Sequence, residues 1–163
     1  MTRARALEWL RAAPGGHQNP DPHTGRVPSY NFWMRLRQIS APDASTSPPR
    51  WGEAPPPVEI AGGLGLRIGS TYDLEMYLGH IGYNVYPPAR GNHYAERSCR
   101  LLLNIARAHG MKRLWITCNP DNWASRRTCE RLGCTLAQII PVPSNHPLYQ
   151  RGDREKCRYW LDL

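Results

Sequence analysis

The sequence contains no long, uninterrupted apolar segment. Hydrophobic residues make up 40% of its 163 residues, but none of their runs approaches the roughly eighteen residues that a membrane-spanning helix needs. The segment 1–11 places arginines between its apolar residues, so it also lacks the continuous apolar stretch of a secretory signal peptide. These absences predict a soluble, cytoplasmic protein that does not bind a membrane.

Paired cysteine motifs are missing as well. The five cysteines are an odd number, and no two of them are spaced as Cys-x-x-Cys. Structural zinc sites and disulfide frameworks both depend on regular cysteine spacing. We therefore expect reduced, unpaired thiols and no metal site.

Lysine is scarce: it occurs only at Lys112 and Lys156, so arginine supplies most of the 21 basic residues behind the net charge of +8. A basic surface favours anionic partners such as nucleotide cofactors, acidic proteins or RNA. The basic residues are scattered, however, and no motif combines them with aromatic residues as an RNA-recognition sheet does. Nucleic acid is therefore not the expected partner, and RNA contact stays a minor alternative.

The length and the order of periodic segments predict a single domain over residues 1–163, of the α+β class. We expect a mixed, mostly antiparallel sheet flanked by helices. The expected helices are 4–13, 92–109 and 123–132; the expected strands are 29–37, 58–68, 72–86, 113–118, 135–142 and 156–163. Residues 40–57 are rich in proline and serine, which predicts a mobile loop between two strands.

The two longer predicted helices each carry an apolar stripe that should pack on the sheet. In the segment 92–109 the stripe comprises Ala95, Cys99, Leu102 and Ala106, widened by Leu101 and Ile105. In the segment 123–132 it comprises Ala124, Thr128 and Leu132.

An apolar strand, a glycine-containing turn and a helix follow one another between residues 81 and 109. Such a turn directs unpaired backbone N–H groups and the positive end of the helix toward one point. Proteins bind phosphate groups in this way. The segment therefore predicts a site for a phosphorylated ligand.

Three motifs occur in this part of the chain in a fixed order: GYNVYP at 82–87, RGNHYA at 90–95, and Asn122 followed by Ser125 and by ERLG at 130–133. Together they resemble the GNAT superfamily of acetyl-CoA-dependent N-acetyltransferases, nearest to its ribosomal-protein-alanine and polyamine acetyltransferase branch. The clear match covers residues 80–134. Three ordered motifs are far more specific than any one of them.

The resemblance implies acetyl-CoA as co-substrate and assigns residues to it. The family's strand pairs its backbone with the pantetheine arm, and the turn holds the diphosphate. The implied cofactor-binding residues are Tyr83, Asn84, Val85, Arg90, Gly91, Asn92, His93, Tyr94, Ala95, Asn122 and Ser125. His93 stands where the family has a glycine, so either its ring turns outward, or it adds a donor to the diphosphate, or cofactor binding has been lost.

The resemblance also implies catalytic residues. Ser125 corresponds to the hydroxyl that protonates the departing thiolate; many relatives use a tyrosine at the position of Cys129 instead. His80 stands where relatives of this branch often have a glutamate, so it is the predicted general base, with Glu75 on the same predicted strand as its rival. The predicted reaction is transfer of an acetyl group to a primary amine by direct attack in a ternary complex.

Each assignment has a structural alternative. Asn122 stands where an N-cap belongs, and Ser125 stands where a hydroxyl bonds nearby backbone. His80 is also consistent with a strand histidine whose hydrogen bonds are satisfied and which moves no proton. Arg126 and Arg127 are candidates for a CoA phosphate or simply solvated charges.

The acceptor is not readable from the sequence. Trp33, Tyr72 and Tyr77 are candidates for lining its pocket, and a polyamine, an amino sugar, an antibiotic or a protein N-terminus all fit. A homodimer that completes the acceptor wall is a further option. The alternative function is a non-catalytic module that binds CoA or a protein.

Overall fold

The computed structural model describes residues 17–18, 27–36 and 60–163. The predicted helix at 4–13 and the proline-rich loop at 40–57 lie outside these residues. The described chain folds into two antiparallel sheets with helices against them, which confirms the α+β class. The division of the whole chain into one domain stays a prediction.

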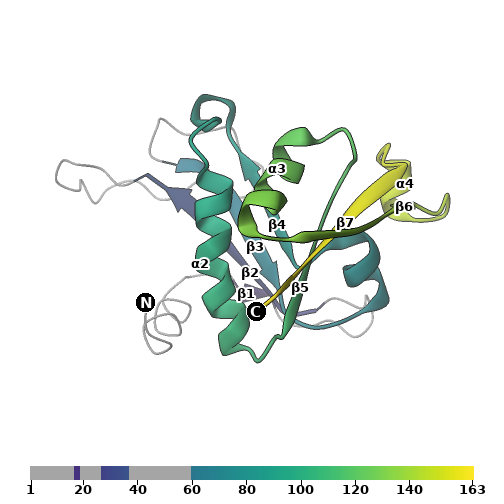
Figure 1. Cartoon of the computed structure of the whole chain (residues 1–163), viewed down its shortest axis with the longest axis horizontal. Coiled ribbons are helices and arrows are strands. Elements are labelled where there is room, and N and C mark those ends of the chain that lie inside the picture. Colours follow the sequence, from purple (N-terminus) through teal and green to yellow (C-terminus); the bar gives the residue numbers. More distant parts are fainter. Residues whose placement is uncertain (1–16, 19–26, 37–59) are drawn as a thin grey trace.

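The first sheet has four strands in the order β1-β2-β3-β4 (Figure 1). They are β1 (His17–Gln18), β2 (Ser29–Arg35), β3 (Ile60–Arg67) and β4 (Ile81–Val85). Consecutive strands pair antiparallel, and Leu64 of β3 lies opposite Tyr83 of β4. The sheet thus places β4, which carries the first cofactor motif, at its edge.

The β3 strand approaches β4 very closely at Gly62. A Cβ atom added to Gly62 would lie 2.1 Å from the carbonyl oxygen of Asn84, so only glycine fits there without moving one of the two strands. The side-chain Oδ1 of Asn84 also accepts a hydrogen bond from the backbone N–H of Gly63 at 3.2 Å. These contacts fix the position of β4 from the β3 side.

The second sheet has three strands in the order β5-β7-β6. They are β5 (Arg113–Cys118), β6 (Thr135–Pro141) and β7 (Glu155–Asp162). The central strand β7 buries Tyr159 and Cys157, whereas β6 lies at the edge with Leu136 and Ile139 exposed. The four predicted strands 29–37, 113–118, 135–142 and 156–163 are confirmed to within about two residues at each end.

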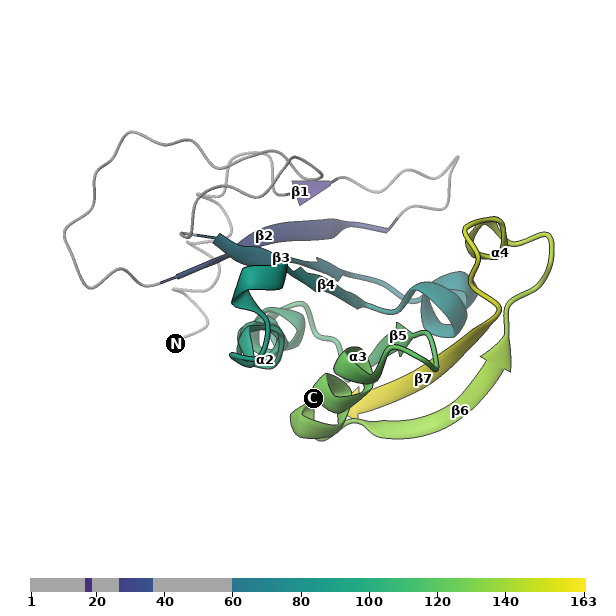
Figure 2. The same ribbon diagram turned by 90° about the horizontal axis from the view of Figure 1, so that it is seen from above.

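The helices are α2 (Tyr94–Ala108), α3 (Trp123–Leu132) and the short α4 (Pro147–Gln150), with a 3₁₀ turn η2 at Pro87–Ala89. Figure 2 shows α2 and α3 on the same side of the first sheet. The short α4 lies between β6 and β7, where no helix was predicted. None of the helices in the described segments has the length and apolar character needed to cross a membrane.

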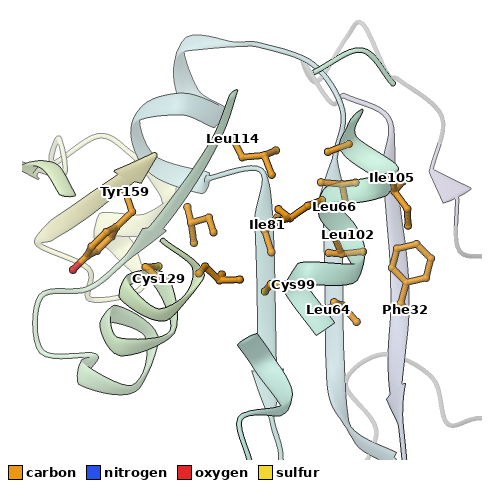
Figure 3. Packing of buried hydrophobic residues seen from close by; sticks show 14 of the residues in the cluster. Phe32, Leu64, Leu66, Ile81, Cys99, Leu102, Ile105, Leu114, Cys129 and Tyr159 are labelled. Atoms are coloured by element: carbon orange, nitrogen blue, oxygen red, sulfur yellow. The ribbon is translucent and has the colours of Figure 1, made fainter. Parts of the chain in front are cut away.

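The main core lies between α2, the first sheet and β5 (Figure 3). Cys99, Leu102 and Ile105 of α2 point toward the strands. The predicted stripe is wrong at one position, because Leu101 is 60% exposed and Leu103 is buried instead. In α3 Ala124 is exposed, and its predicted place in the buried face is taken by Ser125 and Cys129.

The prediction that the strand before the turn starts at Tyr72 is wrong. Residues Leu74–Leu78 form a π-helical turn, η1, and the strand begins at Ile81. The alternation of apolar and polar residues suggested a strand, but the structure buries Leu74 and Tyr77, which are three residues apart as on a helix. Glu75 therefore lies on η1 and not on the strand.

Candidate active site

A cleft of about 750 Å³ opens where β4, α2 and α3 meet. The outer edge of β4 is open here, because among the described residues β4 pairs only with β3. All of the predicted cofactor residues except Asn92 line this cleft. The remaining lining residues are Ala89, Glu96, Ala124, Arg127, Thr128 and Arg131.

The N-terminus of α2 forms one wall of the cleft and is built around a strained residue. His93 has φ 58° and ψ 23°, and among the described residues it is the only non-glycine with positive φ. Histidine tolerates this left-handed conformation better than most residues, though glycine adopts it freely. His93 thus adopts a conformation that a glycine would adopt without strain.

The His93 imidazole does not cap α2 with a hydrogen bond in the part of the chain that the structure describes. Its Nδ1 instead lies 2.8 Å from Nη1 of Arg131, which extends from the last turn of α3. The ring therefore faces across the cleft toward α3, and the first N–H groups of α2 are left for another partner.

The N-terminus of α3 forms the opposite wall and is capped. The Oδ1 atom of Asn122 accepts a hydrogen bond from the backbone N–H of Ser125 at 3.1 Å. The Ser125 hydroxyl lies 2.8 Å from the hydroxyl of Tyr83, which reaches over from β4. Burial raises the pKa of Tyr83 well above its usual range, so this phenol stays protonated and can donate a hydrogen bond.

The comparisons with known proteins place these features in a family. The family model "Acetyltransferase (GNAT) domain" matches residues 2–135, most of the chain. The chain belongs to the GNAT acetyltransferase family. No curated protein matches the sequence.

Solved structures support the fold. A putative ribosomal-protein-serine acetyltransferase from Vibrio cholerae superposes with a TM-score of 0.56 at 18% identity, covering 99% of this chain and 71% of that one. RimL, a ribosomal L7/L12 alpha-N-protein acetyltransferase, gives a TM-score of 0.50 at 24% identity, covering 64% of this chain and 63% of its own. RimL in complex with coenzyme A gives the same TM-score and identity over 56% of its length. The chain thus spans less than two thirds of the RimL chains.

Three arginines of this GNAT domain line the cleft: Arg90, Arg127 and Arg131. Arg126, the other candidate for a CoA phosphate, does not line it; its guanidinium lies over the ring of Trp123 and donates to the carbonyl of Pro120. Arg131 was not among the predicted site residues. Its spacing of four from Arg127 would have placed both on one face of the helix.

The turn before α2 uses some predicted cofactor groups for its own structure. The Nε of Arg90 donates to the carbonyl of Val85 at 3.1 Å. The side-chain amide of Asn92 donates to the carbonyls of Ala89 and Arg90, both at 3.2 Å. These bonds hold residues 85–92 in the shape that presents the α2 end.

Neither of the two predicted bases lines the cleft. His80 is buried, with 2% of its surface exposed, and both of its ring nitrogens bond to backbone groups. Glu75 accepts a hydrogen bond from the hydroxyl of Ser70. Their role in proton transfer stays a prediction.

The cysteines of this GNAT domain are all free. Cys129, which stands in place of the tyrosine of many relatives, is fully buried. The hydrogen bond that the Cys129 S–H donates to Cys134, together with burial, raises the pKa of Cys129, which makes it a poor nucleophile. Within the described segments, no three His, Cys, Asp or Glu side chains are grouped in a way that could hold a metal ion.

Proposed function

We propose that this GNAT domain transfers an acetyl group from acetyl-CoA to a primary amine by direct attack in a ternary complex. One observation carries the proposal: an open strand edge, a helix N-terminus without a side-chain cap among the described residues, and the paired hydroxyls of Tyr83 and Ser125 all face one cleft. The pantetheine arm, the diphosphate and the leaving thiolate each need one of these three features, in that order.

Two parts of the cleft can bind coenzyme A at the same time. The backbone of Tyr83 and Val85 at the open β4 edge would pair with the amide groups of the pantetheine arm. The first N–H groups of α2 and the nearby Arg127 and Arg131 would bind the diphosphate. The His93 ring leaves the α2 end open, which supports binding in spite of the missing glycine.

The reaction needs no covalent enzyme intermediate. The lone pair of the amine attacks the thioester carbon, and the carbon–sulfur bond breaks as the tetrahedral intermediate collapses. The thiolate takes the proton of the Ser125 hydroxyl, while Tyr83 donates a hydrogen bond to Ser125 and keeps its own proton. The proton released by the amine reaches Ser125 through solvent and restores its hydroxyl, so the enzyme ends the cycle unchanged. Holding amine and thioester together supplies much of the rate.

The acceptor amine is the open part of the proposal. Two of the similar structures are named as ribosomal-protein acetyltransferases, so a peptide N-terminus is the first acceptor class to test. Polyamines, amino sugars and amine antibiotics complete the panel. A cytoplasmic location and a homodimer stay predictions.

Two measurements test the function. Calorimetry should detect acetyl-CoA binding. Acetyl-CoA at a hundredfold its Kd should also add about 2.7 kcal/mol to the free energy of unfolding. Release of free thiol from acetyl-CoA should then depend on one class of amine. Binding without release under any amine would support the non-catalytic CoA-binding module instead, and no binding at all would overturn both.

A further inference from the structure

His80 lies where β4 and β5 meet, and each of its polar groups bonds to backbone. Its N–H donates to the carbonyl of Trp115 at 2.6 Å, and its C=O accepts from the N–H of Arg67 at 2.8 Å. Its Nδ1 accepts from the N–H of Trp115 at 2.9 Å, and its Nε2 lies 2.9 Å from the carbonyl of Gly69. One residue thus ties together β3, β5 and the loop after β3.

The backbone groups of His80 point to opposite neighbours. In a regular strand the N–H and C=O of one residue face the same adjacent strand. At His80 the N–H faces β5 and the C=O faces β3. From Ile81 onward β4 is paired with β3 alone among the described residues. His80 is therefore the residue at which β4 leaves β5.

The imidazole takes the place of a strand carbonyl at this point. Trp115 N–H can only donate, so Nδ1 must be the acceptor and the proton must sit on Nε2, where it is donated to Gly69. This fixes a neutral ring in one tautomer. No lone pair of the ring is left to receive a proton from a substrate.

Gly79 allows the close approach that these bonds need. It has φ +70°, and a Cβ atom added to it would lie 2.9 Å from the backbone nitrogen of Thr117 in β5. A side chain at this position would push η1 and the start of β4 away from β5. Gly79 and His80 together hold the two strands in contact just before the part of β4 that lines the cleft.

We propose that His80 is a positioning residue that sets the separation of β4 and β5, and does not carry the substrate proton. The inference rests on the proposed function, because the pantetheine arm is placed at the β4 edge that His80 frees. It assigns the residue predicted as a base to the building of the cofactor cleft.

The charged groups around His80 make the contact sensitive to acid. Burial lowers the pKa of His80 below its ordinary value of 6.5, Arg67 lowers it further and Glu75 opposes this. Since the folded-state pKa is lowered, the stability from neutral His80 is present above the ordinary value and is lost as the pH falls toward the folded-state pKa. Protonated Nδ1 would face the Trp115 N–H, donor against donor.

Two non-titrating replacements separate positioning from proton transfer. His80→Asn keeps an oxygen near the place of Nδ1 to accept from Trp115, and His80→Gln keeps an N–H near the place of Nε2 to donate to Gly69. His80→Ala removes both. The readouts are hydrogen exchange of the Trp115 amide, Kd and KM for acetyl-CoA, and kcat for the best amine.

We expect His80→Asn to protect the Trp115 amide as the wild type does and to retain kcat within about threefold. His80→Ala should lose the protection and raise KM for acetyl-CoA about tenfold, with a smaller change in kcat. If Asn and Gln variants both lose kcat more than a hundredfold with unchanged Kd, His80 is the base and the inference is overturned.

The exchange measurement keeps the two proposals distinct. If wild type binds no acetyl-CoA, the proposed function fails, whereas the Trp115 amide still reports on the role of His80. If His80→Ala does not fold, two other measurements decide whether His80 positions the strands or transfers a proton. They are the kinetics of the Asn and Gln variants and the ¹⁵N shifts of the wild-type ring. A neutral ring that carries its proton on Nδ1 would contradict the assigned tautomer. A ring that titrates near the ordinary value of 6.5 would contradict the buried, neutral contact.

Discussion

The helices α2 and α3 both begin at the cleft, but the backbone N–H groups of their first turns are satisfied in different ways. At α3, Asn122 caps the helix and holds the backbone of Ser125. At α2, the His93 side chain turns to Arg131 and leaves the helix end without a side-chain cap in the described structure. The capped end positions a hydroxyl, whereas the open end offers N–H donors to a ligand.

The open end has a free-energy cost that the capped end avoids. An N-cap contributes about 1 kcal/mol, and a left-handed non-glycine residue costs roughly 1–2 kcal/mol. The N-terminus of α2 lacks a side-chain cap and contains a left-handed residue. This combination is typical of a binding site rather than of a purely structural turn. The contrast leads to four predictions, which alter the two helix ends or the arginines that lie between them in the cleft.

Ser125→Ala should have the largest effect. Removal of the hydroxyl should lower kcat about a hundredfold, because the thiolate loses its proton donor, while Kd for acetyl-CoA changes little. Thiol release at saturating acetyl-CoA measures this. Tyr83→Phe, which keeps the Ser125 hydroxyl without its partner, should lower kcat about tenfold. Wild-type kcat in Ser125→Ala would exclude Ser125 as the acid.

His93→Asp should weaken acetyl-CoA binding about thirtyfold. A carboxylate at the open end of α2 would repel the diphosphate across the short distance that separates them. Calorimetry measures the affinity, and His93→Asn is the matched neutral control of the same shape. Equal affinities of the Asp and Asn variants would show that the diphosphate is not held at this helix end.

Arg127→Ala and Arg131→Ala should each weaken acetyl-CoA binding about fivefold, with the larger loss at low salt. Arg126→Ala is the control, since its guanidinium lies over Trp123 and not in the cleft. Affinity measured at two salt concentrations checks the prediction. A loss for Arg126→Ala as large as for its two neighbours would contradict the arrangement.

Asn122→Ala should have the smallest effect, on stability rather than chemistry. Loss of the cap should cost about 1 kcal/mol, which lowers Tm by roughly 2–4 °C in a protein of this size. Thermal unfolding measures the shift. Asn122→Asp retains an oxygen that accepts from Ser125 and should melt within about 1 °C of the wild type. An equal loss in both variants would show that the cap is not the cause.

Local signals in the sequence predicted the elements that bound the cleft. The strand Arg113–Cys118 and the helix Trp123–Leu132 were predicted to the residue. The strand alternates exposed with more buried positions, and the helix follows its N-cap Asn122 and ends before the left-handed Gly133. The three motifs also led to a set of predicted cofactor residues that, except for Asn92, all line one cleft.

Features that depend on contacts between distant segments were not predictable. Nothing near His80 in the sequence indicates that its ring bonds to Trp115, 35 positions later. The contact of Arg131 with His93 spans 38 positions. The turn η1 was misread because its short apolar alternation fits a strand as well as a π-helical turn, and only burial of Leu74 and Tyr77 decides between them.

Gly62 touches no predicted ligand, yet it governs how wide the cofactor groove can be. Its missing side chain lets β3 lie against the carbonyl of Asn84, and any methyl group there would drive β4 outward into the space where we propose that the pantetheine arm binds. A search for inactivating substitutions would therefore find sensitive positions behind the sheet as well as in front of it. The width of the groove therefore depends in part on the absence of a Cβ atom at Gly62.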